Sequence, residues 1–300
     1  MPRWRTSGLL ALAVALCGAC GAGTVDGEAG AADAAPPSGA ADDPDEGAAG
    51  GDEHPGAVEM ELAVPGDAAW TDTGVEVARG DLVWLEATGT IFLNDTTEVG
   101  PAGHAPDEHD QYNVVPCADH ASLIAGIGEP PSPVPQGDVG WLLVPRSGLL
   151  AFGPNDSDFD NNKGAFTVHL RAPIAVEVID ERSAAVPADA GWVDTGVDVT
   201  TDDLLAISAD GAVDDNTSDE IVRDATGIPG SAGHDFNRVV CGNHAALVGK
   251  IGNDGAPFYV GADLSRLAPA TGRLFLAIND SDTANNGGKL NASILVARAP

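Results

Sequence analysis

The feature that most constrains this chain is an internal repeat. Residues 70–75, WTDTGV, return as residues 192–197, WVDTGV, 122 positions later. Residues 117–121, CADHA, return as residues 241–245, CGNHA, 124 positions later. A unit of about 120 residues present twice is not a solenoid, because stacked arrays need at least about three copies. Each copy is therefore expected to have a hydrophobic core of its own.

Within each copy, apolar residues alternate over short windows such as 82–87 and 274–278, and clusters of Gly, Asn and Asp separate the windows. This pattern is typical of short β-strands. The 38 Gly and 21 Pro residues also argue against a helical bundle. The sequence predicts an all-β fold with two tandem jelly-roll β-sandwich domains, over residues 58–172 and 176–300.

The N-terminus has the organisation of a secretory signal over residues 1–20. Two arginines precede an apolar run at residues 9–16, and small residues then lead to Cys20. The run is far shorter than the roughly 20 residues that span a bilayer. Residues 16–20, LCGAC, resemble a bacterial lipobox, which predicts lipidation of Cys20. The alternative is ordinary signal cleavage beside an incidental thiol.

Residues 21–57 contain no Lys, Arg or aromatic residue and are rich in Ala, Gly, Pro, Asp and Glu. Such a segment buries too little apolar surface to fold, so we expect a disordered acidic tether. Together with the signal, it predicts an exported lipoprotein of the bacterial cell envelope, at the outer membrane or the cell surface. The lipid would be its only contact with the membrane. The net charge of −32 repels phosphate and anionic headgroups, so no nucleic-acid partner is expected.

The densest polar segment is residues 155–164, NDSDFDNNKG, which returns as residues 279–288, NDSDTANNGG. Carboxylate and amide oxygens gathered in one loop suit Ca²⁺, whereas Mg²⁺ demands stricter octahedral geometry. The alternative is a polar turn in which Asp and Asn cap their own backbone, and the recurrence of the loop disfavours it. An EF-hand is excluded, because its sixth and twelfth positions hold Asn161 and Thr167 here.

From this loop the sequence resembles the PA-IL-like bacterial lectins, a galactophilic, calcium-dependent family. The likeness is carried by residues 246–252, ALVGKIG, by Asn279-Asp280 and Asn285-Asn286, and by Gly100-Pro101-x-Gly103 in the first copy. It implies a galactose-binding-like sandwich, one Ca²⁺ per domain, and galactose-type or other carbohydrate as the ligand.

The resemblance also implies the site residues. The first copy would bind calcium through the side chains of Asp156, Asn161 and Asn162 and through backbone carbonyls near Leu93 and Asp158. The second would use Asp280, Asn285 and Asn286, with carbonyls near Asp215 and Asp282. The family's sugar-contacting His falls on His234, with Asn237 beside it, and in the first copy on Asp110, next to His109. The acidic loop is two residues shorter than in the family, and the second copy is the more complete.

Cys117-x-x-His120 and Cys241-x-x-His244 allow three interpretations. They could form one zinc site or a disulfide, but both require the two domains to pack about a two-fold axis. We expect instead one small buried Cys in each core. Trp70 and Trp192, which could stack on a sugar, are likewise expected in the cores.

No motif of a known catalytic class is present, neither Gly-x-Ser-x-Gly nor His-Glu-x-x-His. A glycosidase would need two carboxylates across a cleft, which a sequence does not reveal. The chain is therefore predicted to be a lipid-anchored, calcium-dependent carbohydrate-binding protein and not an enzyme. The alternative is an envelope lipoprotein whose calcium is purely structural and whose partner is another protein.

Overall fold

The computed structural model describes residues 56–94, 96–105, 111–216 and 222–300. The predicted signal, the lipidation site Cys20, nearly all of the tether, and the sugar candidates His109 and Asp110 lie outside these residues. Gly50–Pro300 form one compact unit. In the part of the chain that the structure describes, no helix is both long and apolar enough to cross a bilayer.

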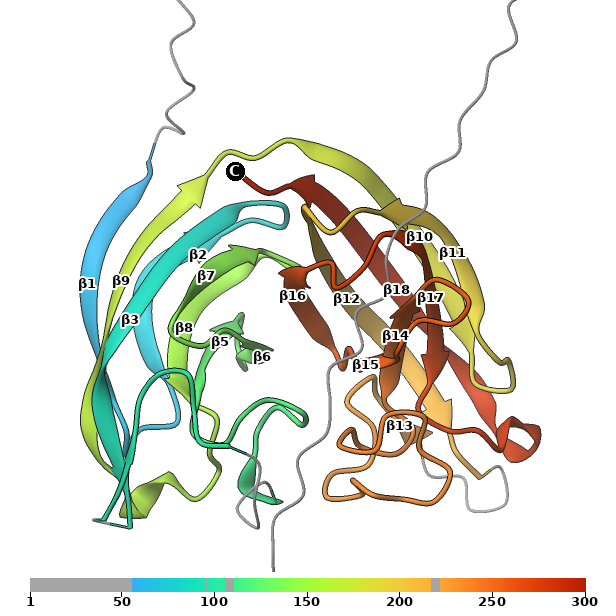
Figure 1. The fold of residues 1–300 in the computed structure, drawn as a ribbon, viewed down its shortest axis with the longest axis horizontal. Coiled ribbons are helices and arrows are strands. Elements are labelled where there is room, and N and C mark those ends of the chain that lie inside the picture. The colour runs from blue at the N-terminus through green and yellow to red at the C-terminus, as the bar shows by residue number, and fades with distance from the viewer. Residues whose placement is uncertain (1–55, 95, 106–110, 217–221) are drawn as a thin grey trace, which may run out of the picture. The chain divides into compact units, whose positions relative to one another are not determined.

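The unit is built from β-strands, which confirms the predicted fold class (Figure 1). The strands of the first repeat are β1 (Val58–Pro65), β2 (Thr71–Val77), β3 (Leu82–Leu93), β4 (Thr97–Val99), β5 (Leu123–Ile127), β6 (Ser132–Pro135), β7 (Val139–Leu143), β8 (Gly148–Pro154) and β9 (Lys163–Ile174). Those of the second repeat are β10 (Val178–Pro187), β11 (Val193–Val199), β12 (Asp203–Asp214), β13 (Val222–Arg223), β14 (Leu247–Ile251), β15 (Phe258–Tyr259), β16 (Asp263–Leu267), β17 (Gly272–Ile278) and β18 (Gly287–Arg298).

Each repeat forms two antiparallel sheets, and no sheet takes strands from both repeats among the described residues. In the first repeat the sheets have the orders β1-β9-β3-β4, with β7 also on β3, and β2-β8-β5-β6. In the second they have the orders β10-β18-β12-β13, with β16 also on β12, and β11-β17-β14-β15. The two repeats therefore share one topology, strand for strand. The exact boundaries of two domains stay a prediction.

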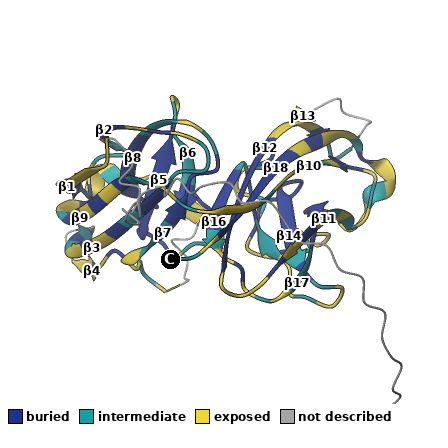
Figure 2. Cartoon of the chain, turned by 90° about the horizontal axis from the view of Figure 1, so that it is seen from above, coloured by how far each residue is buried: buried dark blue, intermediate teal, exposed yellow. Residues whose placement is uncertain are grey.

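Each pair of sheets encloses a core, as the alternation in sequence predicts. In β2, Val75 and Val77 are buried while Asp72 and Glu76 are exposed. One cluster joins both sheets of the first repeat and a second cluster joins those of the second repeat. Figure 2 shows the buried strand interiors within each repeat. Burying one such Val or Leu contributes about 1.5–3 kcal/mol.

The two repeats also contact each other. A smaller cluster contains Leu82 and Leu143 from the first repeat and Leu204 and Leu295 from the second. Polar contacts accompany it. The Leu143 N–H donates to Ser265 Oγ at 2.8 Å, and Arg146 Nε lies 2.6 Å from a carboxylate oxygen of the buried Asp263.

The prediction of separate buried cysteines is wrong. Cys117 and Cys241 form a disulfide with a Cα–Cα distance of 5.1 Å, and both residues are exposed. The equivalent strands β7 and β16 also contact each other. Contacts between equivalent parts are what packing about a two-fold axis produces, and the two equivalent cysteines meet in the same way. Because both sulfur atoms are joined in the disulfide, neither cysteine is available as a thiolate ligand, and the zinc site is excluded.

Trp70 and Trp192 are half-buried and do not belong to the main cores, contrary to our expectation. Trp192 packs on the small cluster of Val239, Val248 and Ala277. Its outer face contacts the Lys250 ammonium, 4.9 Å from the ring centroid. An indole offers both an apolar surface for packing and a π-face for a cation, so Trp192 covers part of the sheet that contains Val248 and Ala277.

Candidate functional site

The acidic loops join two long strands in each repeat. In the first repeat the loop leaves β8, makes a short 3-10 turn at Phe159–Asn161 and enters β9. In the second repeat the equivalent turn is Thr283–Asn285. Asp156 Oδ1 accepts the Asp158 N–H at 2.8 Å, and Asp280 Oδ1 accepts the Asp282 N–H at the same distance. In both aspartates, Oδ1 thus accepts a backbone hydrogen bond inside the loop, as in a polar turn. The other oxygen, Oδ2, faces the side chain of a neighbouring Asn.

A fully buried Asn at the start of each loop attaches it to the loop that carries the cysteine. Asn279 Oδ1 accepts the Val239 N–H at 2.8 Å, and its amide group donates to the carbonyls of Val239, Gly242 and Asn243. Asn155 makes the corresponding bonds in the first repeat. The acidic loop and the cysteine loop therefore form one rigid wall of each site.

In the first repeat the structure brings the five predicted calcium residues together around one cavity of about 270 Å³. Its lining comprises Leu93, Asn94, Gln111, Tyr112, His120, Asp156, Asp158, Asn161 and Asn162. Asn162 Nδ2 donates to Asp156 Oδ2 at 2.9 Å. Asn162 Oδ1 is buried and has no hydrogen-bond partner.

The second repeat reproduces this arrangement. Asn286 Nδ2 donates to Asp280 Oδ2 at 3.0 Å, and Asn286 Oδ1 is again buried without a partner. Asn285 Nδ2 donates to the Asp215 carbonyl at 3.2 Å. The carbonyl that was predicted as a calcium ligand is therefore adjacent to the acidic loop. Asp215 Oδ1 is a further buried oxygen without a partner.

These unpaired oxygens favour a cation site. A buried acceptor without a partner costs free energy, and native proteins have few of them. Here the same atom is unpaired in both repeats, next to a carboxylate. No group of three or more His, Cys, Asp or Glu side chains in the described ranges could hold a metal. The oxygens available to a cation are the Asp156 or Asp280 carboxylate, the Asp215 carboxylate in the second repeat, and amide and backbone carbonyl oxygens. Such a hard-oxygen set suits Ca²⁺ and not Zn²⁺.

Two histidines that we had weighed as zinc ligands instead face the acidic loops. His244 Nε2 lies 3.8 Å from Asp280 Oδ2, and His120 Nε2 lies 4.0 Å from Asp156 Oδ2. Burial lowers the pKa of His244, and the nearby Asp280 carboxylate partly opposes this shift. The usable sequence signal was an Asn seven residues before each His, Asn113 and Asn237, whose Oδ1 contacts the His Nδ1 at 2.8 and 2.9 Å.

The two predicted sugar-binding residues of the second repeat, His234 and Asn237, lie in different environments. His234 is exposed, and its ring centroid lies 4.0 Å from that of His244, which faces Asp280. Asn237 is engaged within the protein, since its amide group also donates to the carbonyls of Gly242 at 2.9 Å and Ser231 at 3.3 Å. Asn237 therefore orients His244 and shapes the loop.

No protein-family model matches the sequence, and no curated protein matches it. Among solved structures, the chain is similar to one described as the EclA N-terminal domain, a PllA-like lectin. The identity is 24%, over 40% of this chain and 97% of that chain, with a TM-score of 0.31. It is also similar to the PBSX exported protein XepA, at 11% identity over 80% of this chain and 85% of that chain, with a TM-score of 0.16. The chemistry of the site is inferred from its own residues.

Proposed function

We propose that this chain is an exported, lipid-anchored protein that binds galactose-type carbohydrate through one calcium ion in each repeat. The observation that carries the proposal is the pair of buried, unpaired oxygens, Asn162 Oδ1 and Asn286 Oδ1, each beside the carboxylate of its own acidic loop. The same buried amide oxygen lacks a hydrogen-bond partner in both repeats. This favours a bound ligand that contacts that oxygen in each repeat.

In the second repeat, the ion would be held by Asp280, Asn285 and Asn286, with the carbonyls near Asp215 and Asp282. In the first repeat, the corresponding residues are Asp156, Asn161 and Asn162, with the carbonyls near Leu93 and Asp158. When bound, Ca²⁺ supplies a cation that takes sugar hydroxyl oxygens as ligands, since it accepts six to eight oxygens. The protein's side chains then select the sugar.

His234 is the best placed of these selecting side chains. It is exposed, and its ring lies against His244, which itself faces Asp280. From there an imidazole nitrogen can hydrogen-bond a hydroxyl of a sugar bound above the loop. Asn237 acts indirectly by holding His244 in place.

Isothermal titration with galactose and its epimer glucose, with excess calcium and again with EGTA, tests this function on the exported chain carrying Cys20→Ala. A small open site should bind the monosaccharide weakly, with a Kd of about 0.1–1 mM, or about 4–5.5 kcal/mol. Heat should appear only with calcium present.

His234→Ala should weaken sugar binding and leave calcium binding unchanged, whereas Asp280→Ala should remove both from the second repeat. The matched control is His169→Ala, because His169 is a half-exposed strand residue that contacts Glu61 and is not among the residues of either candidate site. Calcium binding without heat from any sugar would instead support structural calcium and a protein partner.

A further inference from the structure

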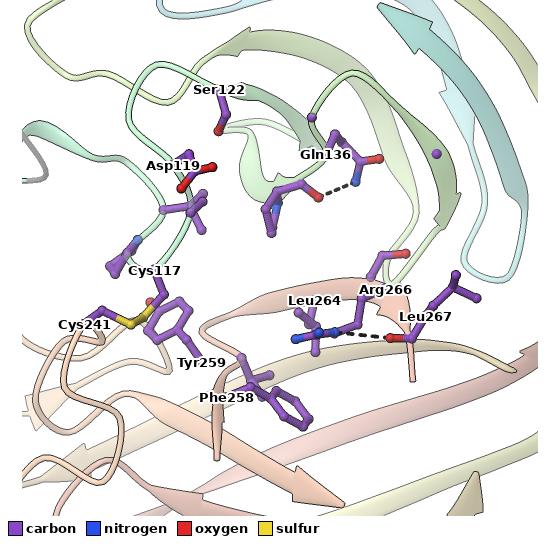
Figure 3. A pocket seen from close by; sticks show the side chains of 18 of the residues that line it. Cys117, Asp119, Ser122, Gln136, Cys241, Phe258, Tyr259, Leu264, Arg266 and Leu267 are labelled. Atoms are coloured by element: carbon purple, nitrogen blue, oxygen red, sulfur yellow. Dashed lines mark hydrogen bonds between the residues drawn. A yellow bond between two sulfur atoms is a disulfide. The ribbon is translucent and has the colours of Figure 1, made fainter. Parts of the chain in front are cut away.

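Two large cavities lie where the repeats meet, and both are lined by the Cys117–Cys241 disulfide, Asp119 and Tyr259. The first has a volume of about 680 Å³. Figure 3 shows it, with the joined cysteines beside the Tyr259 ring and Asp119 on the same loop as Cys117. The second has a volume of about 700 Å³ and is called here the inter-repeat groove. Pockets of about 300–1,000 Å³ commonly hold small organic ligands.

Both repeats supply the walls of the inter-repeat groove. Gln111, Asn113 and Ser157 come from the first repeat, and Thr226, Pro229 and Ala232 come from the second. Gln111 also lines the first-repeat calcium cavity. Ser157 precedes Asp158, which lines that cavity as well. The groove thus begins at the rim of the first-repeat site and continues between the repeats.

The chemistry of the groove favours a neutral, hydroxyl-rich ligand. Its lining is mainly apolar, with Val114, Pro133, Pro229 and Val260 among its walls, and it adds the Ser157 hydroxyl and the Gln111 amide. Apolar surface with a few polar groups suits the C–H faces and the hydroxyls of a sugar. It includes the exposed carboxylate of Asp119, and none of the described residues that line it is Lys or Arg. The other carboxylate of the lining, Asp263, is buried and paired with Arg146. The Asp119 charge disfavours an anionic polysaccharide.

We propose that the inter-repeat groove is an extended subsite for a neutral oligosaccharide whose terminal sugar occupies the first-repeat site. The proposal rests on the proposed function, and it names the substrate class as a chain of several sugars. The two repeats then build one binding site together, and the disulfide holds its two walls at a fixed spacing.

The test compares methyl β-galactoside with lacto-N-neotetraose, a neutral tetrasaccharide that ends in galactose, by titration of the exported chain with calcium. The tetrasaccharide should bind about tenfold more tightly, because its inner sugars contact the groove. Ala232→Trp should remove this preference by filling the groove, and the exposed position of Ala232 allows the larger side chain. Ala185→Trp, at an exposed position of β10 outside the groove, should keep it.

Two more variants locate the terminal sugar. The preference should vanish in Asp156→Ala and persist in Asp280→Ala, because Gln111 lines both the groove and the first-repeat cavity, where the terminal sugar is proposed to bind. Equal affinities for the two ligands, or a preference that survives Ala232→Trp, would overturn the groove while leaving sugar binding intact. If neither ligand binds in the presence of calcium, the proposed function fails and the groove proposal fails with it.

Discussion

At the scale of single residues, the buried Asn279 holds the site together. Its side chain has no exposed surface and bonds four backbone groups of residues 239–243. Asn279→Ala leaves those groups without partners, at about 1–3 kcal/mol each before relaxation. We expect a loss of at least about 3 kcal/mol in the free energy of unfolding, measured by urea denaturation.

The same change at Asn291, on an exposed position of β18, is the matched control and should cost less than about 0.5 kcal/mol. If Asn279→Ala were as mild as Asn291→Ala, the buried bonds of Asn279 would not hold the loops together.

At the scale of elements, the acidic loops should respond to calcium. Each places an unpaired amide oxygen beside a carboxylate, and an ion at 100 times its Kd stabilises the native state by about 2.7 kcal/mol. Calcium should raise the Tm in scanning calorimetry and EGTA should reverse the rise. Asp156→Ala and Asp280→Ala should each remove part of the calcium response, and only the double variant should remove it fully.

Asp254→Ala, at an exposed turn position outside both loops, should keep the whole calcium response. The measured quantity is the difference in Tm with and without calcium, because Asp280→Ala also breaks loop hydrogen bonds. Identical melting curves in calcium and in EGTA would refute the metal sites.

At the scale of the whole molecule, the disulfide joins residues 124 positions apart, one from each repeat. Closing so long a loop restricts the unfolded chain and stabilises the fold by about 2–4 kcal/mol. The Cys117→Ser/Cys241→Ser double variant should therefore lower the Tm by about 5–15 °C. Peptide mapping without reductant should recover the two cysteines in one linked peptide, and free thiols at both positions would contradict the structure.

Anchoring also belongs to the whole molecule. If Cys20 is lipidated, the exported chain should partition with membranes and incorporate labelled fatty acid, whereas Cys20→Ala should be released. Fractionation at low and high salt separates a lipid anchor from binding through charge, because salt screens only the latter. Recovery of the unmodified chain in the soluble fraction, with an N-terminus beyond residue 20, would contradict the anchor.

The sequence by itself determined the fold class and the location of the candidate site. Period-two alternation reports which side of a strand is buried, and Gly and Asn clusters report turns, so strands such as β2 and β17 could be predicted from local pattern. Because the sequence repeats, each pattern could be checked in a second copy. The acidic loops were visible because the residues that gather oxygen atoms, from Asp156 to Asn162 and from Asp280 to Asn286, are close together in sequence.

Only the tertiary structure decided which distant groups meet. The local sequence does not indicate that Cys117 contacts Cys241 or that His120 and His244 face the acidic loops. Nor does it indicate that the Asn237 side chain is hydrogen-bonded within the protein. These contacts depend on how the repeats pack and on how residues 115–119 and 239–243 bond to Asn155 and Asn279. Packing of that kind is set by summed burial over many residues, and it leaves no periodic signal in the sequence.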